Sequence, residues 1–557
     1  MQSYMRALRA GAVLGAVLGA AIGAYKGSWL WPGQSLMMIL RAAGLGWLIG
    51  IAASPMLGLV VSGRAISPRG GGRRPWRRVG GGVLTALALA PAALWVTVML
   101  PDGYMRRAMQ PGRRTGDKRP NLLLITIDAL RADHVGAYGS DRGLTPNLDA
   151  FAAEATRYDA AYVSSPWTLP SFGTIFSTLP PSGCGLKTTL ERMHNWYLYS
   201  AKLPETARLF PEDLRDAGYV TAAELTNCFL APERGWDRAF DYFRNEDGPE
   251  LGAILTRADT VTKNALAWLR LHRREPFFLW IHYLDPHVPY NSPDTPKDLR
   301  AQYPSNWLTR REYWYGKMVQ QDEETKRLYG DFCRAMYAEE VRFADRWVGK
   351  LLAGIKAAGL WDSSLIVITS DHGEELFDHG HFEHGHSLYE EVLRVPLLVK
   401  WPRGFESDEE VMQTVGLIAL GPTFLDAAGL PSEKTSVRPL PQRDGEADME
   451  VFSEGMFWGT ERTALTTGDY KIIYHPHRTS DLPVIEVYDR RDDRSEHHDL
   501  ASDPAEGAPF RDRLAALTAE SETAAKRWKP SGKREFRGID LSDATREKLR
   551  TLGYIGD

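Results

Sequence analysis

Short apolar runs that stop abruptly at polar residues recur along the chain. One run, Ile366–Thr369, is rich in β-branched residues and leads into Asp371-His372-Gly373. A second run, Asn121–Ile127, ends at Asp128, and a third covers Phe277–Tyr283. Runs of this length and composition predict buried strands of a parallel sheet. Because ligands bind beyond the carboxyl ends of such strands, the polar residues that follow these runs are the candidates for chemistry.

Segments of helical periodicity lie between the predicted strands, so we expect a doubly wound, mostly parallel α/β sheet. We predict a catalytic α/β domain over residues 121–430 and a small C-terminal α+β subdomain over residues 431–557. Residues 291–335 are polar and aromatic, and we interpret them as an insertion near the site. The further expected elements are helices over 203–217, 336–352 and 542–552 and strands over 220–225, 393–401, 451–474 and 484–488.

Three uncharged segments near the start of the chain predict an N-terminal membrane region over residues 1–100. Residues 42–61 and 79–100 are each long enough to cross a bilayer core. The shorter segment Ala10–Tyr25 is a third span, for which a signal peptide is the rival interpretation. An arginine-rich loop over residues 64–78 is expected to be cytoplasmic. We therefore predict an integral membrane protein whose catalytic domain lies on the extracytoplasmic side.

Charge is distributed unevenly along the chain. Residues 1–120 carry 16 Lys and Arg against 2 Asp and Glu, whereas the remainder carries 51 against 69. The acidic remainder argues against nucleic acid as a partner. The basic linker over residues 101–120 is either a solvated connection or a surface for anionic membrane lipids. Three cysteines fit neither a disulfide framework nor a cysteine-based zinc site.

The residues after the first two runs suit a divalent cation. Asp128, Asp371 and His372 offer carboxylate oxygens and an imidazole, a mixture that manganese, zinc or calcium accepts. We expect one such metal site, although Asp-His-Gly alone is also a common polar turn. Five histidines between His372 and His386 strengthen the interpretation of a functional cluster.

Several spaced motifs over residues 119–501 resemble the sulfatase family, within the alkaline phosphatase superfamily. They are the Asp128 segment, Ser165–Phe172, and Asp285-Pro286-His287-Val288-Pro289-Tyr290, together with the C-terminal residues 488–501. The resemblance implies that Asp128, Asp371, His372 and Thr168 hold the metal and that Thr168 is the nucleophile. It also implies that His287 and His384, with His386 as second choice, face the substrate, the first two as catalytic groups.

The chain departs from the family pattern at several positions. Ala129 stands where sulfatases usually have a second aspartate. Thr168 stands where they have the cysteine or serine that is converted to formylglycine, and Phe172 replaces an arginine. Cys184 occupies the place of another usual motif residue, and we expect it to be a core or loop residue.

Three functions remain open from the sequence. In relatives such as lipoteichoic acid synthase and the nucleotide pyrophosphatase/phosphodiesterases a threonine attacks phosphorus. A metal-dependent hydrolase or transferase of phosphate-type esters, with a covalent intermediate on Thr168, is therefore the first hypothesis. A sulfuric ester hydrolase acting on cell-surface or glycan sulfate is the second, and an inactive binding module is the third. The substrate would be a small-molecule, lipid-headgroup or glycan ester.

Overall fold

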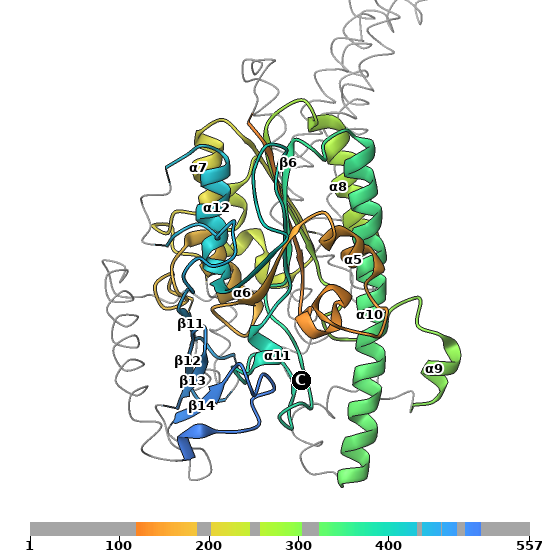
Figure 1. Cartoon of the computed structure of the whole chain (residues 1–557). Helices are drawn as coiled ribbons and strands as arrows, with labels where there is room; N and C mark the ends of the chain where they lie inside the picture. The colour runs from red at the N-terminus through yellow and green to blue at the C-terminus, as the bar shows by residue number, and fades with distance from the viewer. Residues whose placement is uncertain are drawn as a thin grey trace, which may run out of the picture. The chain divides into compact units, whose positions relative to one another are not determined.

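The computed structural model of this chain describes residues 119–186, 202–245, 257–303, 322–431, 437–457, 459–475 and 485–502 (Figure 1). The chain divides into two compact units, residues 1–112 and 113–557, and all described residues belong to the second. The predicted membrane spans and the predicted helix over 542–552 lie outside the described residues. Among the helices of the described ranges, none has the length and apolar character needed to span a bilayer.

A central sheet of eight strands organises the described residues, in the order β10-β2-β9-β6-β1-β5-β3-β4. Strand β1 lies in the middle and pairs in parallel with β5 on one side and β6 on the other. Only β9 runs antiparallel to its neighbours, β6 and β2. The prediction of a mostly parallel α/β sheet is therefore confirmed. The strands are β1 (Asn121–Ile127), β2 (Thr156–Tyr162), β3 (Val220–Leu225), β4 (Tyr242–Asn245), β5 (Phe277–Tyr283), β6 (Ser364–Thr369), β9 (Leu397–Lys400) and β10 (Glu410–Gly416).

Helices cover both faces of this sheet (Figure 1). Side chains of β1 alternate between two apolar clusters, with Leu122 and Leu124 in one and Leu123 and Ile125 in the other. This alternation follows from the period of two residues in a strand. Helices α6, α7 and α12 pack into the first cluster, and α5, α8 and α10 into the second. The helices are α5 (Pro146–Ala152), α6 (Thr168–Ser177), α7 (Phe210–Asp216), α8 (Ala258–His272), α9 (Lys297–Ala301), α10 (Glu323–Ala357), α11 (Glu390–Leu393) and α12 (Leu420–Ala427).

Helix α10 begins well before the predicted residue 336, inside the segment that we interpreted as an insertion. The side chain of Asp322 caps its first turn by accepting the N–H of Thr325 at 2.8 Å. Tyr329, Phe332 and Met336 are buried at helical spacing. The aromatic residues of this part of the segment therefore form the buried face of a long helix.

Two other predicted elements are shorter than expected. Helix α7 begins at Phe210 rather than residue 203, because Pro211 in its first turn has no N–H to donate to an earlier turn. Strand β9 begins at Leu397 rather than residue 393, because residues 390–393 form α11 and Pro396 follows. Both differences show proline fixing an element boundary.

A smaller antiparallel sheet of four strands, β11-β12-β13-β14, follows in the C-terminal part. Its strands are β11 (Val451–Ser453), β12 (Thr463–Thr466), β13 (Tyr470–Tyr474) and β14 (Ile485–Asp489). A two-stranded hairpin of β7 (Glu375–Leu376) and β8 (Phe382–Glu383) follows β6 and carries His384 just beyond its second strand. The predicted strands over 451–474 and 484–488 correspond to the small sheet.

Candidate active site

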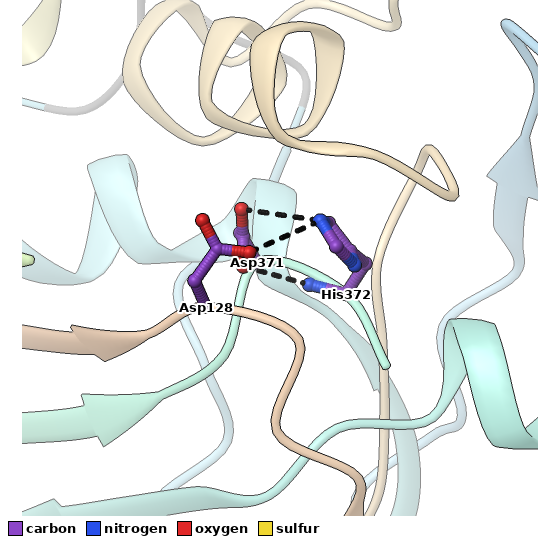
Figure 2. A group of neighbouring side chains, drawn as sticks. All are labelled: Asp128, Asp371 and His372. Carbon is purple, nitrogen blue, oxygen red and sulfur yellow. Dashed lines mark hydrogen bonds and ion pairs between the residues drawn. The ribbon is translucent and has the colours of Figure 1, made fainter. Parts of the chain in front are cut away.

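Asp128, Asp371 and His372 meet at one edge of the central sheet. Asp128 follows β1. Asp371 and His372 follow β6, which pairs in parallel with β1. Parallel strands bring their carboxyl ends to the same edge. One ligand atom from each residue lies within 4.8 Å of the other two, and Figure 2 shows the imidazole of His372 facing both carboxylates. All three side chains are fully buried.

The polar atoms that face one another in this group suit a bound cation. Asp128 Oδ1 and Asp371 Oδ2 each lie 3.5 Å from His372 Nε2. Neither oxygen has a hydrogen-bond partner, although both are buried. His372 Nδ1 lies 2.8 Å from the Gly373 carbonyl, so Nδ1 carries the proton and Nε2 presents its lone pair. Two buried carboxylate oxygens without a hydrogen-bond partner, converging with an imidazole lone pair, are an arrangement that a metal ion satisfies.

The surroundings shift the pKa values of the two carboxyl groups in opposite directions. Burial and then the charge of Asp128 raise the pKa of Asp371 well above its usual range. Burial also opposes the charge of Asp128, but His287, His282 and His372 together hold the pKa of Asp128 below its usual value. A second negative charge is therefore costly here unless a cation joins the group.

Thr168 belongs to the same group. Its hydroxyl lies 3.3 Å from His372 Nε2, and its side chain is fully buried. Its side chain does not cap the helix that follows. Trp167 holds the N-cap position, and Thr168 is the first residue of α6. The position still places its oxygen at the positive end of the helix dipole.

His287 and His384 lie beside the candidate metal ligands. The ring centroid of His384 is 4.1 Å from that of His372 and 4.9 Å from that of His287. His287 Nδ1 lies 2.6 Å from the Val288 carbonyl, and His384 Nδ1 lies 2.9 Å from a Glu374 oxygen. Burial lowers the pKa of His287 to about 4, and burial and His372 lower that of His384 well below its usual value.

His386 has a different neighbour. Its Nε2 lies 2.9 Å from Glu375, which also accepts the Ser387 hydroxyl. The structure thus gives His386 a partner within the hairpin, and its role toward substrate stays a prediction. His379 pairs with Glu391 at 2.8 Å and stacks on Tyr389, so its contacts lie away from the candidate metal group.

Four residues that the sequence did not assign to the site contact its candidate ligands or its histidines. Asn227 donates to Asp128 Oδ2 at 2.8 Å, and His282 Nε2 lies 3.2 Å from the same oxygen. Glu374 accepts the Tyr290 hydroxyl at 3.1 Å while holding His384. Asn227 was predictable, because it follows the parallel strand β3 at the same edge of the sheet.

The departures from the family pattern have plain structural consequences. Ala129 adopts a left-handed backbone (φ 58°), a conformation that suits Asn, Asp or Gly better than Ala. Phe172 is buried, with its ring centroid 4.8 Å from Trp280 and 5.0 Å from His282. Cys184 is buried, as predicted for a core or loop residue.

The fold and this group of side chains define an α/β protein with a mostly parallel central sheet and a candidate metal site. The family model "Sulfatase" matches residues 120–430, and the chain belongs to the sulfatase family. A second model, "N-sulphoglucosamine sulphohydrolase, C-terminal", matches residues 377–520. The expected ester-hydrolase family is thus confirmed at that level.

Relatives with assigned activities cover most of the chain. A Δ4,5-hexuronate-2-O-sulfatase of Bacteroides thetaiotaomicron is 23% identical over 479 residues, covering 78% of this chain and 94% of that protein. An N-acetylglucosamine-6-O-sulfatase of the same organism is 23% identical, covering 73% and 86%. A solved structure described as a complex with its substrate D-glucosamine-2-N,6-O-disulfate has a TM-score of 0.57 at 21% identity, covering 74% and 100%. The phosphonate monoester hydrolase of Agrobacterium radiobacter has the same fold, with a TM-score of 0.56 at 17% identity, covering 72% and 96%.

Proposed function

We propose that this chain hydrolyses sulfate esters of glycans at a single divalent-metal site, with Thr168 as the nucleophile. The observation that carries the proposal is the convergence of Asp128, Asp371, His372 and the Thr168 hydroxyl on one buried point. The choice of sulfate and of a glycan is supported by the named activities of the relatives. It replaces the phosphate-type ester as the first hypothesis.

The metal would be held by Asp128 Oδ1, Asp371 Oδ2 and His372 Nε2, with the Thr168 oxygen beside them. When bound, a divalent ion lowers the pKa of a coordinated hydroxyl and stabilises negative charge on the substrate oxygens. Asn227 and His282 hold the other Asp128 oxygen, so the ligand oxygen is oriented before a metal arrives.

Catalysis would proceed by two displacements at sulfur. Thr168 Oγ1 forms a bond to sulfur while the bond from sulfur to the glycan oxygen breaks. The proton lost by Thr168 balances the one gained by the leaving alcohol, and His287 and His384 are the neutral imidazoles placed to carry it. A water molecule then attacks sulfur, which releases sulfate and restores the Thr168 hydroxyl.

Threonine changes the second displacement relative to most sulfatases. A formylglycine hydrate has two hydroxyls, and the second can expel sulfate by breaking a carbon–oxygen bond. Thr168 has a single hydroxyl, so its sulfate ester is cleared only by attack of water on sulfur. We therefore expect this step to limit turnover, and the sulfated Thr168 to accumulate.

The single hydroxyl of Thr168 makes phosphate-type esters a second candidate class of substrate. Water attacks a phosphorylated hydroxyl side chain at phosphorus without needing a second hydroxyl. We propose a direct comparison of full-length protein, reconstituted with Mn²⁺, Zn²⁺ or Ca²⁺, on 4-nitrophenyl sulfate, 4-nitrophenyl phosphate and bis-4-nitrophenyl phosphate. Preferred cleavage of the sulfate supports the first function, and preferred cleavage of a phosphate supports the second. Metal binding without any turnover, on these substrates and on sulfated disaccharides, would favour the inactive binding module.

We further propose that the three uncharged N-terminal segments anchor the enzyme, with residues from 101 onward outside the cytoplasm. The positive loop over residues 64–78 supports this orientation. Such an anchor would keep the site near lipid headgroups and cell-surface glycans. Protease added to intact cells should digest the catalytic domain, and full protection of that domain would overturn the orientation.

A further inference from the structure

A segment of the C-terminal part, Ser453–Phe457, contacts both loops that carry the proposed catalytic side chains. We infer that this segment, which we call the clasp, positions Thr168 against His384 and so belongs to the catalytic apparatus of the proposed hydrolase. The expected effect of the clasp on turnover rests on the proposed function. The restraint that it places on the Thr168 and His384 loops rests on the contacts alone.

The clasp first binds the loop that leads to Thr168. Ser453 Oγ donates to the Val163 carbonyl at 2.8 Å, and the Glu454 N–H donates to the Ser164 carbonyl at 3.0 Å. Trp167 Nε1 donates to the Gly455 carbonyl at 2.7 Å, and the Ser165 hydroxyl donates to the same oxygen at 3.3 Å. Trp167 directly precedes Thr168, so Gly455 restrains the residue that starts the nucleophile helix.

The clasp also binds the loop that carries His384. The Phe457 N–H donates to the Gly385 carbonyl at 2.7 Å. The ring of Phe457 lies 4.7 Å from that of Trp167 and 6.2 Å from that of Phe229, measured between centroids. Phe457 therefore contacts three segments at once. One carries His384, one leads into Thr168, and one follows Asn227, which supports Asp128.

The opposite end of the first turn of α6 is fixed independently. Ser171 Oγ donates to the Asp371 carbonyl at 2.6 Å, which holds the helix to the metal ligands. The clasp therefore restrains the start of α6 from a second side. Because a misplacement of about 1 Å can lower a rate roughly 100-fold, loss of the clasp should reduce turnover more than substrate binding.

Two glycines of the same region give a matched pair of variants. Gly455 (φ 85°) and Gly459 (φ 79°) have the same left-handed backbone, which alanine adopts with strain. An added Cβ meets nothing within 4 Å at Gly459 and only ordinary contacts at Gly455. The two alanine variants thus share the conformational penalty, and only Gly455→Ala displaces the carbonyl that binds Ser165 and Trp167.

The experiment compares Gly455→Ala, Gly459→Ala and Trp167→Phe in the full-length protein. Gly455→Ala and Trp167→Phe should lower kcat roughly 10- to 100-fold, with KM and Mn²⁺ affinity within about threefold of native. Gly459→Ala should retain native kcat. Equal kcat losses in the two glycine variants, or native kcat in Trp167→Phe, would overturn the positioning role.

Hydrogen–deuterium exchange provides a readout that needs no substrate. In Gly455→Ala, but not in Gly459→Ala, amide exchange should quicken in both the 163–171 and 382–387 peptides. Unchanged exchange in these peptides would overturn the clasp even if the native protein hydrolysed sulfate esters. Quickened exchange in a protein that turns over neither ester class would support the clasp while refuting the proposed function.

Discussion

The Thr168 hydroxyl lies 3.3 Å from Nε2 of His372, although 204 positions separate the two residues in the chain. The contact joins the first turn of α6 to the loop after β6. It brings the proposed nucleophile within reach of a proposed metal ligand, and the proposed chemistry depends on it.

Thr168→Ala should abolish the covalent step. We expect kcat to fall by roughly 1,000-fold or more, because removal of a nucleophile leaves only binding and electrostatic stabilisation. Thr168→Ser keeps the hydroxyl and should retain measurable turnover. Steady-state rates on the preferred nitrophenyl ester, with melting temperatures to check folding, measure this. Native turnover by the alanine variant would remove Thr168 from the mechanism.

Metal preference should follow the donor set. The imidazole of His372, and the replacement of a second carboxylate by Ala129, favour Mn²⁺ or Zn²⁺ over Ca²⁺. Calorimetric titration of metal-free protein should give tighter binding of the first two ions, and thermal unfolding should show the larger stabilisation with them. Tighter binding of Ca²⁺ would contradict this donor-based argument.

Asp371→Asn should have opposite effects with and without metal. In metal-free protein the change removes one of two poorly compensated buried carboxylates, so we expect stabilisation of roughly 1–3 kcal/mol. The added stability on metal binding should disappear. Asp345→Asn is the control, because Asp345 accepts hydrogen bonds from Asn147 and the Leu148 N–H and its loss should destabilise both forms. Destabilisation of metal-free Asp371→Asn would show that the carboxylate is satisfied without a cation.

Glu374→Gln should weaken catalysis through His384. The carboxylate fixes the proton on His384 Nδ1 and also accepts the Tyr290 hydroxyl. We expect kcat to fall roughly 10- to 100-fold, as for other groups that orient site histidines. Tyr290→Phe leaves the bond between Glu374 and His384 intact, so its loss of kcat should be smaller. Similar losses in both variants would instead assign the effect to the Tyr290 contact.

Alkaline pH should destabilise the fold through His379. Burial opposes its charge, but the hydrogen bond and charge of Glu391, with the Glu496 carbonyl, raise the pKa of His379 to about 9. An unfolded histidine titrates near pH 6.5, so the bound proton stabilises the fold fully below that pH. This stability, at most roughly 3 kcal/mol, is lost as the pH rises through about 9.

His379→Gln should therefore flatten the decline of unfolding free energy between about pH 7 and 10, as measured by denaturant titration. His381 is the control, because burial lowers its pKa and its titration lies below this window. An equal slope in native protein and His379→Gln would refute the assignment.

The ligands at the sheet edge were predictable because strand periodicity and polar run endings fix their place. Asp128, Asp371 and His372 follow two runs whose parallel pairing brings them together. The supporting residues were harder to foresee. Glu374 and Tyr290 act across 84 positions of chain, and no local pattern records such a partnership. The predicted start of α10 at residue 336 is too late, because the aromatic residues before it, which we interpreted as part of an insertion, have helical spacing.

Helix α6 is buried along its whole length, and Phe172 fills the space between it and Trp280. Installing the cysteine and arginine of the usual sulfatase motif at positions 168 and 172 would consequently put a guanidinium into an aromatic environment. An uncompensated buried charge costs several kcal/mol. Conversion of this enzyme to aldehyde-dependent chemistry would thus require redesign of the surrounding core as well as a change of nucleophile.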